Sequence, residues 1–135
     1  MSDSDIRITI LENHGDHRGN SFNIPEDSLI YLHRAQNVHI ANVKPAAVRG
    51  NHYHLKRKEL LLVYHDGPWL LCWDTGEQTP IQKKIFEGAG CALIEIAPDV
   101  SHAIQNTGNG ALVIVVLSDH VYSPEDSDTY TRTLL

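Results

Sequence analysis

Short apolar stretches divided by turn residues run along almost the whole chain, and this pattern constrains the fold more than any other feature. Within most stretches hydrophobic and polar residues alternate, as expected of β-strands that bury one face. Gly, Pro, Asn and Asp gather between them, for example at 66–68, 75–77 and 107–110. Short strands separated by such turns are typical of an antiparallel barrel or sandwich, so we predict an all-β fold.

The predicted strands cover residues 6–11, 28–34, 38–43, 49–54, 59–65, 69–74, 82–86, 91–96, 102–106 and 111–117. A helical turn competes with a strand only in residues 25–34, because Pro25 followed by two acidic residues is typical of a first helical turn. The stretch 111–117 is almost entirely apolar, which favours a strand covered on both faces, by a second sheet or by a partner subunit. The polar tail after Tyr122 lies outside the strand series.

Length and charge limit the class of protein. The chain has 135 residues, of which 41% are hydrophobic and 21% charged, as expected of one globular domain over residues 1–135. The net charge of −6 repels phosphate backbones, which argues against nucleic-acid binding. No apolar stretch is long enough to span a bilayer, and residues 1–5 lack the features of a signal peptide. We therefore expect a cytoplasmic protein without membrane partners.

Two cysteines and two tryptophans lie in apolar stretches, and we predict structural rather than catalytic roles for them. Cys72 and Cys91 have apolar neighbours, which predicts buried, reduced thiols rather than a disulfide. Trp69 and Trp73 share one face of a predicted strand, which favours core or dimer packing over sugar stacking.

Two histidines and a glutamate form the group of residues that indicates chemistry. His52 and His54 are two positions apart on a predicted strand, so their side chains share one face. Glu59 opens the next strand with the same parity as Leu61 and Val63, which predicts that it faces the core. A core-facing carboxylate is costly unless it is paired or binds a metal ion, and two imidazoles on the same interior supply a reason for it.

A further inward-facing ligand is available at His102, which shares its parity with Ile104 and Asn106. Three imidazoles and one carboxylate suit zinc, iron, nickel or manganese. We predict one divalent metal ion, with zinc as first choice, bound by His52, His54, Glu59 and His102. Such a ligand set leaves positions open to water or substrate, which is typical of a catalytic site.

These residues resemble the two motifs of the cupin superfamily. His52, His54 and Glu59 match the first motif, in which two histidines one residue apart precede a glutamate. Pro98 and His102 match the second, although the interval between them is one residue short. The resemblance implies a cupin-type double-stranded β-helix, that is, a jelly-roll barrel.

A closer resemblance concerns bacterial capsular-polysaccharide enzymes. Residues 49–59 and the tail 121–130 look like the metal-binding cupin domain of these enzymes, which also carry a reductase domain and epimerise a 4-keto nucleotide sugar. Residues 16–19, Asp-His-Arg-Gly, resemble an early motif of sugar 3,5-epimerases and 3,4-ketoisomerases. The resemblance implies a metal-dependent epimerase or isomerase of a 4-keto nucleotide sugar, active in surface-polysaccharide synthesis.

For such a reaction we expect proton carriers and an anion-binding group. Lys56 and Tyr130 are the candidate catalytic residues, whereas Tyr53 faces away from the histidines by parity. Arg49 or Arg18 could bind a pyrophosphate with two hydrogen bonds.

Two other functions fit the same ligand set. One is an iron-dependent dioxygenase of a small organic substrate, because a fold does not fix a function. The other is a non-catalytic cupin that binds a metal ion or a sugar. In each case the expected partners are a small molecule and a second copy of the chain in a homodimer.

Overall fold

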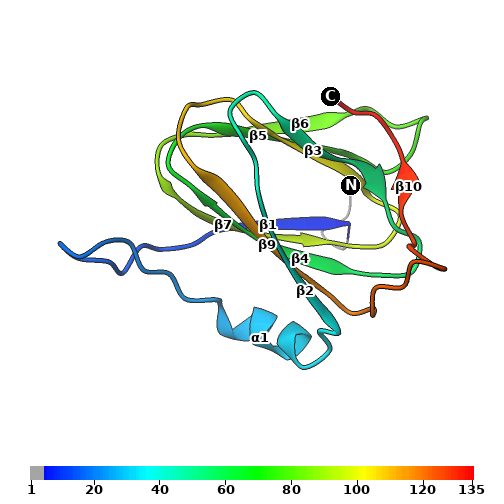
Figure 1. Cartoon of the computed structure of the whole chain (residues 1–135), viewed down its shortest axis with the longest axis horizontal. Coiled ribbons are helices and arrows are strands. Elements are labelled where there is room, and N and C mark those ends of the chain that lie inside the picture. The colour runs from blue at the N-terminus through cyan, green and yellow to red at the C-terminus, as the bar shows by residue number, and fades with distance from the viewer. Residues whose placement is uncertain (1–4) are drawn as a thin grey trace.

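The computed structural model describes residues 5–135 as two antiparallel five-stranded sheets that face each other in a jelly-roll sandwich (Figure 1). One sheet has the order β1-β7-β4-β9-β2 and the other the order β10-β3-β8-β5-β6. The elements are β1 (Ile6–Ile10), α1 (Glu26–Leu32), β2 (Asn37–Asn42), β3 (Val48–Tyr53), β4 (Glu59–His65), β5 (Trp69–Asp74), β6 (Gln82–Phe86), β7 (Gly90–Ile96), β8 (Ser101–Asn106), β9 (Leu112–Ser118) and β10 (Tyr130–Thr131). The all-β jelly roll predicted from the sequence is confirmed.

The main core lies between the two sheets. Inward side chains of β4 and β7, such as Val63 and Ile94, meet those of β5 and β8 and are fully buried. Trp69 is also fully buried, and its ring stacks on Phe86 with centroids 4.0 Å apart and planes 4° apart. Trp73 belongs to the same core cluster, so the packing role predicted for the two tryptophans is confirmed.

The strand predicted at residues 28–34 is wrong, because this stretch forms α1 (Glu26–Leu32). Pro25 is the N-cap residue with φ −58°, close to the helical value, and Glu26 and Asp27 place negative charge at the N-terminus, where the helix dipole favours it. Ser28 and Tyr31, three residues apart on one helical face, are the buried residues of the helix. Tyr31 packs with residues of β4 and β7, so α1 covers the outer face of their sheet (Figure 1).

The apolar strand β9 is covered on both faces within one chain. Its inward residue Ile114 belongs to the core between the sheets, as the second-sheet alternative predicts. On the other face, Leu117 packs against a second cluster that includes Tyr31 of α1 and Leu60 of β4. The outer cover over Leu117 therefore includes the chain's own helix, which is neither of the two predicted covers, a second sheet or a partner subunit.

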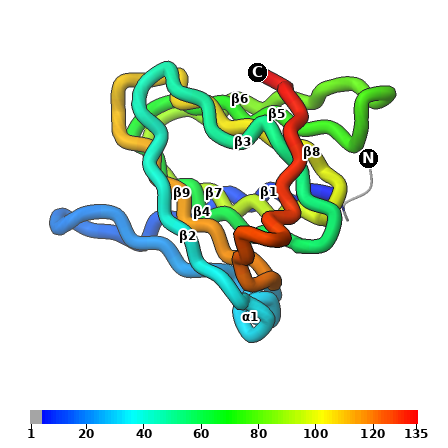
Figure 2. Tube along the Cα trace, turned by 45° about the vertical axis from the view of Figure 1, so that its right-hand side comes forward, coloured from blue at the N-terminus to red at the C-terminus, as the bar shows by residue number. Residues whose placement is uncertain are grey.

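The polar C-terminal tail adds an edge strand, contrary to the expectation that it lies outside the strand series. Tyr130 pairs with Tyr53 and Thr131 with His52, so β10 extends the sheet beside β3 (Figure 2). Further along, the side-chain oxygen of Asn51 accepts hydrogen bonds from the backbone N–H groups of Leu134 and Leu135. The tail is thus fixed along the strand that carries His52.

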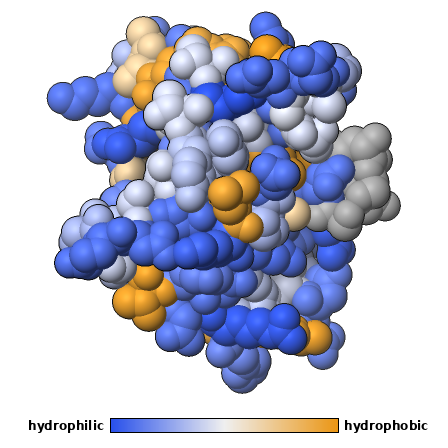
Figure 3. Space-filling model, turned by 90° about the vertical axis from the view of Figure 1, so that its right-hand side faces the viewer, coloured by the Kyte–Doolittle hydropathy of each residue, from blue (hydrophilic) through white to orange (hydrophobic). Residues whose placement is uncertain are grey.

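Residues 12–21 form an arm whose tip extends away from the sheets (Figure 2), while Leu11 and Phe22 at its base pack against the second core cluster. Asp16 and Gly19 form a bridge at its tip, and Arg18 forms an exposed ion pair with Asp16 at 2.7 Å. The surface seen from the side of β10 is mostly hydrophilic and carries only scattered hydrophobic residues (Figure 3).

Among the described residues, no helix has the length and hydropathy that a membrane span requires. The prediction that the N-terminus lacks a signal peptide concerns residues 1–5, of which 1–4 lie outside the described residues. Cys72 and Cys91 are both buried and free, as predicted.

Candidate metal and ligand site

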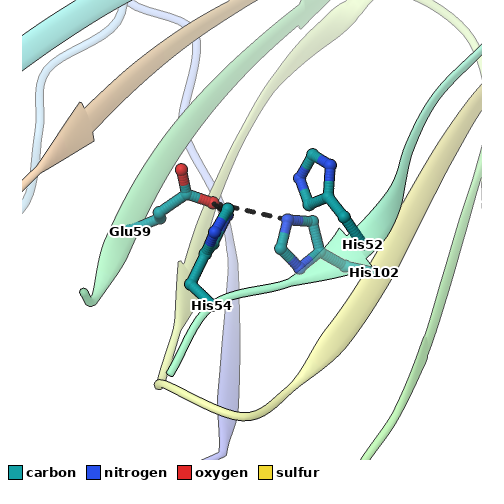
Figure 4. Close-up of side chains that lie close together, drawn as sticks. All are labelled: His52, His54, Glu59 and His102. Atoms are coloured by element: carbon teal, nitrogen blue, oxygen red, sulfur yellow. Dashed lines mark ion pairs between the residues drawn. The ribbon is translucent and has the colours of Figure 1, made fainter. Parts of the chain in front are cut away.

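The side chains of His52, His54, Glu59 and His102 point toward one another at one end of the sandwich (Figure 4). One potential ligand atom from each residue lies within 4.8 Å of all the others. Ligand atoms bonded at up to 2.2 Å to a tetrahedral zinc ion lie about 3.6 Å apart, so the most distant pair would have to close by up to about 1.2 Å. The structure therefore brings the four predicted residues into a group that could hold one metal ion.

The strand pairing explains how residues distant in sequence meet here. His52 of β3 lies opposite His102 of β8, after a register shift between Gly50 and His52. Gly50 has a φ of +96°, and a Cβ atom there would lie 2.7 Å from the carbonyl oxygen of His102. Only glycine fits this close approach without displacing the backbone that carries His102.

Glu59 enters the cluster from the other sheet. It is the first residue of β4, and the strand alternation places it on the same face as Leu61 and Val63, both in the core. The inward direction predicted from parity is therefore correct. Since β3 and β4 belong to different sheets, the cluster joins the two layers of the sandwich.

Backbone carbonyl groups set the tautomer of two histidines. Nδ1 of His54 lies 2.7 Å from the carbonyl oxygen of Asp128, and Nδ1 of His102 lies 3.1 Å from that of Val100. A carbonyl oxygen only accepts, so each Nδ1 carries the proton and a neutral ring keeps its lone pair on Nε2. These Nε2 atoms lie 3.2 and 3.3 Å from Oε1 of Glu59.

The cluster fits a metal ion better than it fits a hydrogen-bond network. Nε2 of His54 is buried and makes no hydrogen bond, although Oε1 of Glu59 lies nearby. Buried polar atoms rarely lack a partner. The Nε2 lone pair of His54 lies beside the Glu59 carboxylate and two further imidazoles, and a cation bound by all four groups would satisfy it.

Electrostatics within the cluster favour the protonation states of metal ligands. Burial, followed by the influence of the His102 and His54 rings, lowers the pKa of His52 from 6.5 to about 4. Burial by itself opposes ionisation of Glu59, but when the adjacent His102 and His54 rings carry protons toward it they outweigh burial and hold the pKa of Glu59 below its usual range. At neutral pH His52 is therefore neutral and Glu59 is a carboxylate, which are the states that bind divalent metals.

A cavity of about 580 Å³ opens above the cluster. This volume is in the range of about 300–1,000 Å³ that is common for small-molecule sites. Ile104, Ile114 and Val116 contribute apolar walls, and Arg49 and Arg57 contribute positive charge. The site can thus accept a partly apolar ligand that carries a negative group.

The other predicted site residues lie in different places. Arg49 lines the cavity. Lys56 and Tyr130 do not line it: Lys56 forms an ion pair with Asp126 at 2.5 Å, and the ring of Tyr130 stacks on Tyr53. Arg18 lies between Asp16 and Gly19 at the tip of the arm and does not line the cavity either.

Four residues of the site were not predicted from the sequence. Arg57, His39 and Tyr122 line the cavity, and Asp128 contacts His54 behind it. His39 and Ala41 are two positions apart on β2 and therefore share one face, and both line the cavity. The small apolar Ala41 is the one sequence signal for the direction of His39. Nothing in the basic run around Arg57 or in the polar tail around Asp128 distinguishes them from solvated surface residues.

Two antiparallel sheets in this order form the RmlC-like cupin fold, with the His and Glu cluster between them. Residues 14–130 match the family of the polysaccharide biosynthesis C-terminal domain, and the chain belongs to this family. A search among curated proteins finds no match to the sequence.

Several solved structures share the fold. The capsular polysaccharide assembling protein CapF from Staphylococcus aureus is 24% identical with a TM-score of 0.66; the match covers 92% of this chain and 34% of CapF. This chain therefore spans about one third of the length of CapF. QdtA, a sugar 3,4-ketoisomerase from Thermoanaerobacterium thermosaccharolyticum in complex with TDP, is 18% identical with a TM-score of 0.68, covering 96% and 89%.

The rmlC epimerase of Mycobacterium tuberculosis is 14% identical with a TM-score of 0.71, and the match covers 97% of this chain and 70% of the epimerase. At these identities the likeness shows a common fold and leaves the reaction of this chain to be argued from its own residues.

Proposed function

We propose that the chain binds one divalent metal ion through His52, His54, Glu59 and His102 and isomerises or epimerises a 4-keto nucleotide sugar. The main support for this proposal is that the cluster and two arginines, Arg49 and Arg57, line the same cavity. Zinc is our first choice of metal, since three imidazoles and a carboxylate are ligands that it accepts. Membership of a polysaccharide biosynthesis family supports a sugar substrate.

The two arginines are proposed to bind the anionic part of the substrate. Arg57 lies nearest the cluster: its side chain is largely buried, and its Nε, which makes no hydrogen bond, lies 3.9 Å from Oε2 of Glu59. Its Nη2 donates to Oγ1 of Thr129 at 3.0 Å, which holds the guanidinium in place. Arg49 adds a second positive charge at the cavity wall. A diphosphate can accept from both groups.

Isomerisation next to a ketone requires a base that removes a proton from carbon and an acid that returns one. A divalent ion at the cluster would supply positive charge to the substrate carbonyl oxygen. Lys56 and Tyr130, the residues predicted for proton transfer, lie outside the cavity lining. We therefore propose His39 and Tyr122, which line the cavity, as the proton carriers in their place.

Deuterium exchange tests this function directly. Protein loaded with zinc is incubated in D₂O with TDP-4-keto-6-deoxyglucose, and incorporation of deuterium into the sugar is followed by NMR. We expect exchange with the wild-type chain and at least a tenfold loss in His39→Gln, in line with the usual contribution of a general base of about 10²–10⁴. His33→Gln is the matched control, because His33 is exposed at the end of α1.

Two results would contradict the proposal. Absence of exchange into any 4-keto nucleotide sugar by metal-loaded protein would exclude the isomerase. Oxygen consumption by iron-loaded protein with a small organic substrate would favour the dioxygenase instead. The homodimer stays a prediction, which light scattering on the purified chain tests.

A further inference from the structure

We propose that Asp128 is a positioning residue for the metal ligand His54, so that metal affinity depends on a residue of the C-terminal tail. This inference rests on the proposed metal binding. Asp128 cannot reach the ion as a ligand in this arrangement, since both its carboxylate and its carbonyl group are engaged by the segment 54–57. It would act through the orientation of the His54 ring.

The carboxylate of Asp128 binds the turn that connects the first two ligands to the third. Its Oδ1 accepts a hydrogen bond from the backbone N–H of Leu55 at 3.0 Å. Its Oδ2 accepts from the N–H groups of Lys56 and Arg57, each at 3.1 Å. Three consecutive amides therefore converge on one carboxylate, and Asp128 is only 6% exposed. Charge-assisted bonds of this kind are stronger than neutral ones.

The backbone of the same residue contacts the ligand itself. Asp128 has a φ of +49°, and its carbonyl oxygen accepts from Nδ1 of His54 at 2.7 Å. The left-handed backbone is sparsely populated by residues other than Gly, Asn and Asp. The carboxylate bonds to the turn stabilise this conformation, and with it the direction of the carbonyl group toward His54.

The two orienting contacts of the cluster differ in origin. His102 is held by the carbonyl of Val100, two residues earlier and just before β8. His54 is held by a residue 74 positions away in the sequence. Loss of the distant contact would free the His54 ring to rotate and to exchange tautomers, because no other hydrogen bond of its Nδ1 is present among the described residues.

A general loosening of the tail can be separated from loss of this contact. Arg132 and Asp74 form an ion pair that fixes the tail at another point, without contact to the cluster. Arg132→Gln therefore loosens the tail and leaves Asp128 in place. Asp126→Ala is a second control, because Asp126 is half-exposed and pairs with the Lys56 side chain in the same turn.

The experiment measures zinc affinity by competition with a chelator on the full chain. Asp128→Gly removes the carboxylate and tolerates the positive φ. We expect it to weaken zinc binding by about 10–100-fold, the usual effect of losing an outer partner of a metal ligand. Asp128→Asn keeps the backbone preference and loses one acceptor oxygen, so it should give a smaller loss and serves if Asp128→Gly does not fold. Both controls should retain wild-type affinity.

A second readout needs no metal. The imidazole ¹⁵N spectrum of the metal-free chain should show His54 protonated at Nδ1 in the wild type and in Arg132→Gln, and a mixture of tautomers in Asp128→Gly. Wild-type affinity together with an unchanged tautomer in Asp128→Gly would overturn this inference alone. Equal weakening by Arg132→Gln would overturn it as well. A wild-type chain that binds no zinc would overturn the metal site and the inference together.

Discussion

His52 and His102 lie directly opposite each other on β3 and β8, with ring centroids 4.8 Å apart and planes at 89°. The pairing of two strands of one sheet sets this relationship, and the surrounding core is apolar and extensive. The fold therefore holds the cluster in place without needing a metal ion to form. Predictions for the site and for the fold can be tested separately.

Removal of one ligand should abolish metal binding and spare the fold. In His54→Ala we expect the metal content to fall from about one ion per chain to almost none, a larger loss than the roughly 10–100-fold caused by outer partners. Elemental analysis gives the metal content, and circular dichroism should show the same β-sheet content. His39→Gln, which changes another histidine of the cavity, should keep its metal. Full occupancy in His54→Ala would refute the ligand assignment.

The stack of Trp69 on Phe86 should be a main source of core stability. Trp69→Ala should lower the free energy of unfolding by about 3–5 kcal/mol, because it leaves a cavity in a fully buried cluster. Trp69→Phe should cost distinctly less, since the indole Nε1 is buried without a hydrogen-bond partner and its loss removes an unpaired donor. Urea denaturation measures both values, and equal losses would contradict this account.

The ion pair between Arg132 and Asp74 should stabilise the chain only while both partners are present. The side chain of Asp74 is completely buried and that of Arg132 is 19% exposed. Arg132→Gln should lower the free energy of unfolding by about 3 kcal/mol, because it leaves a buried charge unpaired. Adding Asp74→Asn should recover part of this loss in a double-mutant cycle. A double variant less stable than Arg132→Gln would show that the pairing is not the cause.

The two thiols should make stability fall at alkaline pH. Burial raises the pKa of Cys72, with a smaller opposing effect of Lys83, and burial raises the pKa of Cys91. The unfolded chain loses these protons near pH 9 and the folded chain at higher pH, so the stabilising effect is complete below pH 9 and declines as the pH rises. Urea denaturation from pH 8 to 10 should show this decline.

Alanine at both cysteine positions should make the dependence weaker over the same range. In native protein at pH 8, neither thiol should react with a thiol-specific reagent, whereas both should react in denaturant. Rapid labelling of the native chain would contradict the burial of the thiols.

The sequence determined the strand series and indicated three neighbouring members of the cluster, His52, His54 and Glu59. Hydrophobic alternation is a local property, so it predicted nine of the strands to within a residue or two. Parity placed Glu59 on the face of Leu61 correctly, because side chains alternate strictly along a strand. Local periodicity failed at residues 28–34, where contacts of Tyr31 with the outer face of a sheet decide in favour of a helix.

Only the tertiary structure decided which distant residues complete the site. Parity predicted an inward direction for His102, but only the pairing of β8 with β3 brings it opposite His52. The pairing of β10 with β3 brings the tail, and with it Asp128, beside His54, and no local pattern in a polar segment indicates such a contact. The physical reason is that strand order and register depend on the packing of the whole sandwich, whereas alternation depends on neighbouring residues alone.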